Sequence, residues 1–304
     1  MRLICITVTA LLVGGGISDA TPPLPWGAKG HEMAARTATG VLPQQMPRFF
    51  RDAADQLIYL APEPDRWRNG DLEEMDQAWN YDHYIDFENV PEGALDAPDR
   101  FTFLKALYDA GPEKPKHEVG FLPYRIMEMY QRIVTEWRMW YAEADTQNTQ
   151  KRQWIEARIL NDAGILGHYV TDASQPHHTT VHFNGWSAGA PNPEGYSTDR
   201  SFHARFESGF VDAHVTQTDV ANQASQDPPT SVAGSARDAV WDYVEQSHGY
   251  VSELYRLDRD VGFHPQALMR SETRDFAAGR LAAGADMLAV LWWSAWLESR
   301  ASRP

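Results

Sequence analysis

The sequence predicts an all-α protein with a single domain. Apolar and aromatic residues recur every three or four positions through most of the chain, as they do on the buried face of a helix. No segment alternates apolar and polar residues like a half-buried strand, and no internal repeat is present. With 304 residues, 43% of them hydrophobic, the chain can bury a substantial core.

The first twenty residues have the organisation of a signal peptide. Arg2 supplies a positive charge, residues 3–13 are apolar, and Ser18 and Ala20 are spaced like a signal-peptidase site. The apolar run is too short to span a bilayer. We therefore expect an exported protein with a signal peptide at 1–20, one helical domain at 21–304 and no transmembrane segment. The only cysteine, Cys5, lies in the signal segment, so the mature chain offers no thiolate ligand.

Helical and loop patterns alternate along the expected domain. Residues 61–98 and 179–200 are rich in Pro, Gly, Asn and Asp, which predicts two long loops. Small, apolar and aromatic residues at helical spacing predict the helices, and Thr230 or Ser231 could cap one of them. The helices are expected at 30–41, 43–60, 118–143, 151–172, 201–215, 231–257 and 271–299.

The charge balance narrows the classes of partner. With 27 basic and 42 acidic residues the net charge is −15. A protein that binds duplex DNA electrostatically needs a basic surface, so that class is disfavoured. A phosphate-containing substrate is still compatible, because carboxylates that bind divalent cations are neutralised locally. Nothing in the composition implies a stable protein partner.

Two pairs of side chains have the spacing of metal ligands on a helix. His168 and Asp172 are four residues apart, and His203 and Glu207 repeat this arrangement, which places each pair on one helical face. His178 follows a proline shortly after the first pair. Either pair alone would also suit an ordinary surface helix. Together they favour zinc or another borderline divalent metal, which binds imidazole and carboxylate.

Five segments of the chain, taken in order, resemble a known superfamily. They read W-G-x-x-G-H at 26–31, P-D-x-W-R at 64–68, H-Y-I-D at 83–86, H-x-x-x-D-x-x-Q-P-x-H at 168–178 and H-x-x-x-E at 203–207. This set resembles the superfamily that joins the type I single-strand-specific nucleases of fungi and plants with the bacterial zinc-dependent phospholipases C. The resemblance implies an all-α fold with three zinc ions in a cleft.

The resemblance also implies a role for each matched residue. One zinc ion would be held by Asp65, His83, His168 and Asp172, a second by His178, His203 and Glu207, and a third by Trp26 and His31, with Asp172 bridging. Paired zinc ions lower the pKa of a bound water to about 7, and the hydroxide so formed attacks phosphorus. Asp65, Arg68 and Asp172 are the residues expected to act in catalysis.

The N-terminal side of the resemblance differs from the family pattern. In the family the tryptophan is the first residue of the mature protein and binds zinc through its amine and carbonyl. Cleavage after Ala20 would leave five residues ahead of Trp26. Either a second trimming step exposes Trp26, or the third zinc site is incomplete.

Three features favour the nuclease branch. The spacing from Trp26 to His31 is that of the nucleases. Arg68 matches an arginine suited to the charge of the transition state, although it could instead pair with Glu73 or Glu74. Tyr84 and Asp86 match positions that stack on and hydrogen-bond a nucleobase. The alternative for these two is a core tyrosine and an aspartate that caps a loop.

Other features favour the phospholipases, or no catalysis at all. Glu207 stands where the nucleases usually have aspartate, and the acidic surface would suit a lipid headgroup. Lys29 disfavours choline, because it stands where those phospholipases carry a glutamate. An exported zinc-binding protein without activity is a further alternative, but structural zinc sites usually have every position filled, and the second group has only three protein ligands.

The favoured prediction is an exported zinc-dependent nuclease that cleaves single-stranded DNA or RNA and could also act as a 3′-nucleotidase. The loop at 181–200 is expected to shape access to the substrate. Its Trp186 and Tyr196 could stack on a base or face a lipid, but packing of the loop against the body is the favoured role.

Overall fold

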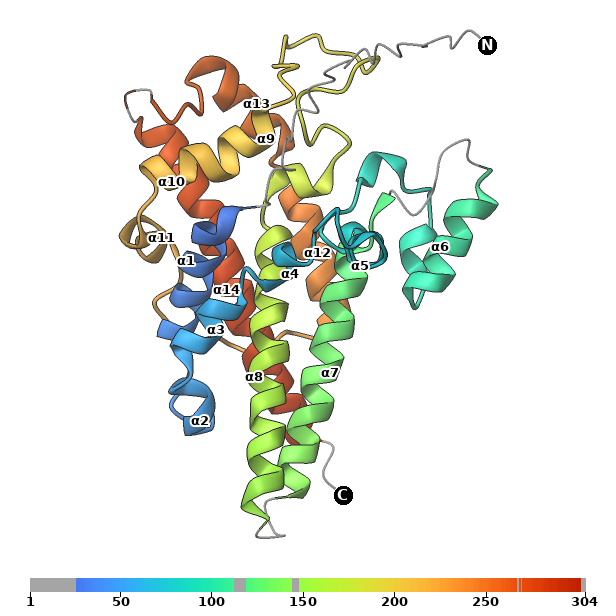
Figure 1. Cartoon of the computed structure of the whole chain (residues 1–304). Coiled ribbons are helices and arrows are strands. Elements are labelled where there is room, and N and C mark those ends of the chain that lie inside the picture. Colours follow the sequence, from blue (N-terminus) through green and yellow to red (C-terminus); the bar gives the residue numbers. More distant parts are fainter. Residues whose placement is uncertain (1–25, 112–118, 144–147, 267, 269, 302–304) are drawn as a thin grey trace, which may run out of the picture.

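The computed structural model describes residues 26–111, 119–143, 148–266, 268 and 270–301. Over these residues the protein is a single all-helical domain without β-strands, as the sequence predicts (Figure 1). The predicted signal peptide lies outside the described residues. No helix in the described part of the chain is both long and apolar enough to cross a membrane.

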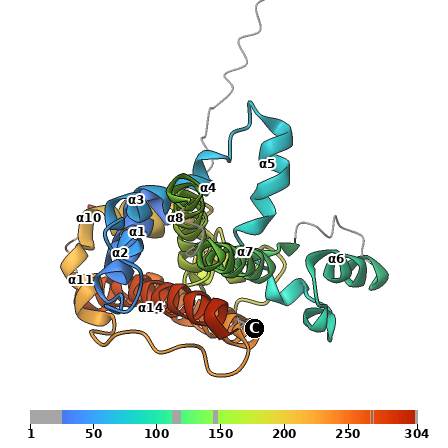
Figure 2. The same ribbon diagram turned by 90° about the horizontal axis from the view of Figure 1, so that it is seen from below.

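Three long helices form the body of the molecule, and shorter helices surround them. α7, α8 and α14 pack along one another, and α1 and α3 lie against α14 and α8 (Figures 1 and 2). α6 lies beyond α7, on the outer side of the bundle, in both views. The helices are α1 (Gly27–Gly40), α2 (Arg48–Arg51), α3 (Ala54–Leu60), α4 (Glu63–Arg66), α5 (Glu73–Trp79), α6 (Arg100–Asp109), α7 (Leu122–Ala142), α8 (Thr149–Asp172), α9 (Phe202–Ala204), α10 (Val211–His214), α11 (Gln217–Gln223), α12 (Ala236–His248), α13 (Val251–Asp260) and α14 (Ser271–Ala301).

Aromatic side chains fill the core between these helices. Trp137 and Trp292 are buried between the long helices, and the indole N–H of Trp292 donates to the carbonyl of Ala163 at 3.1 Å. A second core cluster includes Phe206 and Phe263, whose ring centroids lie 4.7 Å apart. The Phe206 ring also lies 5.5 Å from the Trp26 ring, and the Phe263 ring lies 5.1 Å from that of Phe210. Residues of α1 and α14 belong to both clusters, so α1, which carries the predicted ligand His31, is anchored in the core.

The predicted helices are confirmed where the apolar period is long, and several predicted boundaries are wrong. The helix expected at 231–257 is two helices, because the chain turns at Gly249–Tyr250, and Ser235 rather than Thr230 or Ser231 caps the first one. The segment 61–98 is not one long loop, since it contains α4, α5 and three 3₁₀ turns. α6 and α11 are capped by Asp99 and Thr216, and these short helices have too little apolar periodicity to be predicted.

The start of α7 fixes the segment that carries the predicted ligand His83. The backbone N–H of Phe121 donates to the carbonyl of Tyr81 at 2.7 Å, and that of Leu122 donates to Tyr84 at 3.1 Å. Gly120 allows this close approach, because its φ is +91° and a Cβ atom there would lie 2.1 Å from the Tyr84 carbonyl oxygen. His83 is therefore held from both sides by backbone hydrogen bonds to α7.

Replacing Gly120 with alanine should destabilise the protein by about 1–3 kcal/mol, because the new methyl group would displace the Tyr84 backbone. Chemical denaturation of the metal-free protein measures this loss. Gly70→Ala is a matched control, since a Cβ atom at Gly70 would meet nothing within 4 Å. Equal unfolding midpoints for Gly120→Ala and wild type would contradict this account of the α7 start.

Candidate metal centre

The structure brings eight predicted ligands together in three adjoining, largely buried groups. Their ligand atoms lie within 4.8 Å of one another inside each group. α8 contributes two of these residues, and α1, α4 and several turns contribute the rest. The groups are His31, His168 and Asp172; Asp65, His83 and His168; and His178, His203 and Glu207.

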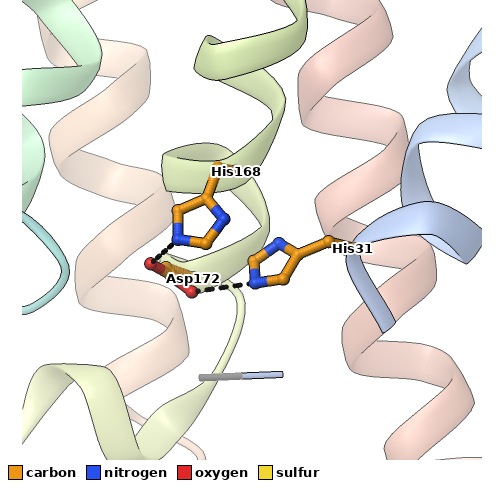
Figure 3. Close-up of side chains that lie close together, drawn as sticks. All are labelled: His31, His168 and Asp172. Carbon is orange, nitrogen blue, oxygen red and sulfur yellow. Dashed lines mark ion pairs between the residues drawn. The ribbon is translucent and has the colours of Figure 1, made fainter. Parts of the chain in front are cut away.

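The first group joins α1 to the C-terminal end of α8. His168 and Asp172 lie one turn apart on α8, and His31 approaches from α1 (Figure 3). The Nε2 atom of His31 is 3.5 Å from Oδ1 of Asp172, and Nε2 of His168 is 3.2 Å from Oδ2. The two imidazole rings stack at a centroid distance of 4.0 Å. Asp172 thus uses one oxygen toward each histidine.

The second group adds the carboxylate of Asp65, whose oxygens lack hydrogen-bond partners among the described residues. Nε2 of His168 lies 3.6 Å from Oδ1 of Asp65, and Nδ1 of His83 lies 3.0 Å from Oδ2 of Asp172. Both carboxylate oxygens of Asp65 are buried and have no hydrogen-bond partner among the described residues. Burial, which outweighs the nearby His168, raises the pKa of Asp65 to about 7. A buried carboxylate of this kind is an energetic cost that a bound cation would remove.

The third group is built by a turn, a helix and a π-helical segment. Nε2 of His203 lies 2.7 Å from Oε2 of Glu207, and Nε2 of His178 lies 3.6 Å from the same oxygen. The Nε2 atoms of the two histidines face each other at 3.2 Å. Glu207 lies in the π-helical turn η6 (Arg205–Phe210), a form that occurs often at functional sites.

Asp172 and Trp26 connect the third group to the other two. Oδ1 of Asp172 lies 3.7 Å from Nδ1 of His178. The backbone N–H of Trp26 donates to Oε2 of Glu207 at 2.9 Å, and its indole N–H donates to the carbonyl of Thr171 at 3.0 Å. The predicted ligand Trp26 therefore lies at the centre, with its backbone nitrogen facing a carboxylate.

Backbone carbonyls orient two of the imidazole rings. Nδ1 of His168 lies 2.9 Å from the carbonyl oxygen of Ala61, and Nδ1 of His178 lies 2.6 Å from that of His83. A carbonyl only accepts hydrogen bonds, so Nδ1 carries the proton in both rings and Nε2 is left with its lone pair. This second contact is typical of histidines that ligate metals.

The charges of the centre depend on one another. Burial alone would raise the pKa of Asp172, but His168 and His178 hold it well below its usual range. Burial likewise opposes the charge on Glu207, and His203 and His178 lower its pKa to about 2. Three carboxylates thus share a buried site with histidines, and no cysteine takes part. This donor set fits zinc or another borderline divalent cation, and the unmatched oxygens of Asp65 support the fit.

Arg68 lies close enough to the centre for its charge to act on two of the ligands. Burial raises the pKa of Asp65 and lowers that of His83; the Arg68 charge opposes the first shift and adds to the second. Within the described part of the chain Arg68 forms no ion pair with Glu73 or Glu74, the alternative that the sequence left open.

The two candidate base-binding residues differ in their surroundings. Tyr84 is half-buried, 6.5 Å from the Tyr81 ring, so it is not a core residue. Asp86 makes no capping hydrogen bond, and the structure shows no described partner for its buried Oδ1. Burial, and then the nearby Glu88, raise the pKa of Asp86 to about 7. The carboxyl group of Asp86 is thus available to a ligand that can reach it.

The loop that follows the centre packs against the body, as the favoured sequence interpretation predicts. The Trp186 ring stacks on His182 at 3.8 Å, and its indole N–H donates to the Pro191 carbonyl at 3.0 Å. The Tyr196 ring lies 5.5 Å from that of Tyr255 on α13. These two aromatic residues therefore hold the loop in place.

Two further residues differ from what the sequence suggested. Lys29 cannot be read as a headgroup-facing charge, because its ammonium donates to the carbonyls of Asp212 and Val215 at 2.8 and 2.9 Å, at the end of α10. His177, the neighbour of the predicted ligand His178, is buried with its ring centroid 4.7 Å from that of Phe202 and 5.0 Å from that of His203. It supports the ligand helix from an aromatic pocket.

Comparison with models of known protein families finds no match, and comparison with characterised proteins finds none either.

Proposed function

We propose that this protein is an exported zinc-dependent phosphodiesterase of the type I nuclease and phospholipase C superfamily, and that its substrate is single-stranded nucleic acid. The observation that supports this most directly is that eight residues with nitrogen and oxygen ligands, Asp172 among them, meet in three adjoining groups, from segments that are up to 176 residues apart (207 − 31). Their order along the chain is the order in which the superfamily carries its ligands.

The side chains of the centre divide the chemistry among them. Zinc ions held by the three groups would supply Lewis acidity and an acidified water for attack on phosphorus. Asp172 keeps the groups together, because its two oxygens face histidines from all of them. The carboxylates reduce the positive charge of the site, and Arg68 provides a cation for the negative charge that develops on the phosphoryl oxygens.

Nucleic acid is favoured over phospholipid by the residues next to the centre. Tyr84 offers a half-buried ring, and Asp86 offers a buried acceptor oxygen on the same segment as His83. A nucleobase presents both a π-face and N–H donors, so it would use both side chains. A phospholipase C remains the second candidate, because Glu207 replaces the aspartate that is usual in the nucleases.

The test is cleavage by the zinc-loaded protein of single-stranded DNA, duplex DNA and phosphatidylcholine vesicles, each with and without chelator. We expect cleavage of single-stranded DNA that the chelator abolishes and zinc restores. Release of phosphocholine without cleavage of DNA would assign the protein to the phospholipase branch. Zinc-loaded protein that cleaves none of the three substrates would instead support a non-catalytic zinc-binding protein.

A pair of variants separates catalysis from metal binding. Arg68→Met should lower kcat about 100-fold with unchanged zinc content, because it removes a charge that acts on the transition state. Arg66→Met is the matched control, since Arg66 ends the short helix α4 two residues before Arg68 and pairs with Glu63. Equal kcat values for both variants would contradict the role of Arg68.

A further inference from the structure

We infer that the buried ion pair between Asp82 and Arg125 positions the metal centre, by holding His83 and His168 from the side of α7. This role rests on the proposed metal binding. Asp82 directly precedes His83, and Arg125 lies on the first turn of α7. Neither residue belongs to the three ligand groups.

The first route of contact runs through the chain. The Asp82 side chain is 1% exposed, and its Oδ2 accepts from Nε of Arg125 at 2.7 Å and also from a terminal nitrogen of the same guanidinium. Its Oδ1 accepts from Arg100 on α6 at 2.8 Å. With Oδ2 held by Arg125 and Oδ1 held by Arg100, both the position and the orientation of the carboxylate are fixed. The backbone that leads into His83 is therefore fixed from the α7 side.

The second route runs through an aromatic ring. The Arg125 guanidinium carbon lies 4.3 Å from the Trp79 ring centroid and 5.7 Å from that of Tyr169. The Tyr169 ring in turn lies 5.4 Å from the His168 ring and 5.5 Å from the His83 ring. Tyr169 has a buried hydroxyl without a described hydrogen-bond partner, so packing alone holds this ring.

Stability alone is a weak reason for burying such a pair. Moving the Asp82 carboxylate and the Arg125 guanidinium out of water costs free energy that their mutual attraction need not repay. Buried ion pairs can often be replaced by apolar residues without loss of stability, whereas they do specify one arrangement of the groups around them. Because this pair lies close to His83 and His168, the arrangement that it specifies is that of these two ligands.

The effect should extend from the second ligand group to the third. The carbonyl of His83 accepts from Nδ1 of His178 at 2.6 Å, and the N–H of Ile85 donates to the His178 carbonyl at 2.9 Å. A displaced His83 would therefore also release the ring of His178. Loss of the pair should disturb the site that includes His83 most and the His178 site less.

The experiment measures metal binding by purified, metal-free full-length protein and needs no substrate. Co²⁺ titration gives the visible spectrum of the bound metal, and competition with a chromophoric chelator gives the zinc affinity. We expect Arg125→Met and Asp82→Asn to weaken zinc binding about 10–100-fold and to change the Co²⁺ spectrum, which is the usual cost of losing a group that orients a ligand. Arg125→Lys should lie between these variants and wild type, because it keeps the charge but not the planar fork.

Arg132→Met is the control for stability. Arg132 lies seven residues after Arg125 on α7 and pairs with Asp162 on α8 at 2.8 Å, and neither residue belongs to a ligand group. This variant should keep the wild-type zinc affinity and Co²⁺ spectrum whatever its thermal midpoint.

The outcomes separate the two levels of the proposal. Wild-type affinity and an unchanged spectrum in Asp82→Asn would overturn the positioning role, even if its thermal midpoint falls. That isosteric variant also decides the question if Arg125→Met does not fold. Wild-type protein that binds neither Co²⁺ nor zinc would overturn the proposed function, and the positioning role with it.

Discussion

Replacing Asp172 with alanine should abolish both zinc loading and phosphodiester cleavage. Its two oxygens lie 3.0–3.7 Å from nitrogen atoms of His31, His83, His168 and His178, so this one carboxylate contacts members of all three ligand groups. Without Asp172 the buried histidines His168 and His178 would also lose the neighbouring negative charge that stabilises their positive charge. Elemental analysis of the purified variant and an assay on single-stranded DNA measure the two losses.

The control for this variant is Asp162→Asn, a change of another buried aspartate on α8. Asp162 pairs with Arg132 and lies outside the ligand groups, so its variant should retain zinc and activity. An Asp172→Ala protein that binds a full complement of zinc and cleaves DNA normally would rule out Asp172 as the bridging residue.

Removal of the metal should lower the thermal midpoint of the protein, and the loss should be larger at pH 8 than at pH 6. A ligand present at a thousandfold its Kd stabilises the folded state by about 4 kcal/mol, which corresponds to roughly 10 °C for a chain of this size. Differential scanning fluorimetry with and without chelator measures the shift at each pH.

The pH dependence follows from the histidines of the metal-free protein. Burial alone would lower the pKa of His168 and His178, but the neighbouring carboxylates, Asp172 foremost, raise it above the usual value. A raised pKa means that protonation stabilises the metal-free fold below about pH 6.5. This contribution is lost as the pH rises through the pKa of the folded state.

Bound metal replaces these protons, so the metal-loaded protein is spared that loss. The difference between the loaded and stripped proteins therefore widens with pH. Asp172→Ala provides the control, because its midpoint should not respond to chelator. A wild-type midpoint that chelator leaves unchanged at pH 8 would argue against a metal in this buried site.

Local spacing explains why part of the centre could be predicted. His168 with Asp172, and His203 with Glu207, are four residues apart, and in a helix this spacing alone places both side chains on one face. The same periodicity correctly predicts α7, α8 and α14. Where the period is short or broken, as in α4, α5 and the division between α12 and α13, the sequence prediction is wrong.

The relation between the pairs is beyond any local pattern. Asp65 lies on the short helix α4, and His83 follows a 3₁₀ turn, both in a segment that the sequence suggested was a loop. Only their resemblance to a family marked them as ligands. Asp82 and Arg125 had no signal at all, because an aspartate before a histidine and an arginine on a helix are common. Their meeting requires the start of α7 to lie against residues 81–84.

The sequence by itself determined the all-helical class, the long helices and the two ligand pairs, since each depends on contacts within about one helical turn. The tertiary structure alone decided that Asp172 also contacts His178 and that Trp26 meets Glu207 across 181 residues. It also decided that Arg125 of α7 pairs with Asp82, the residue before His83. These contacts depend on how separate helices pack. That packing is set by the shape and burial of whole faces, which no single stretch of sequence contains.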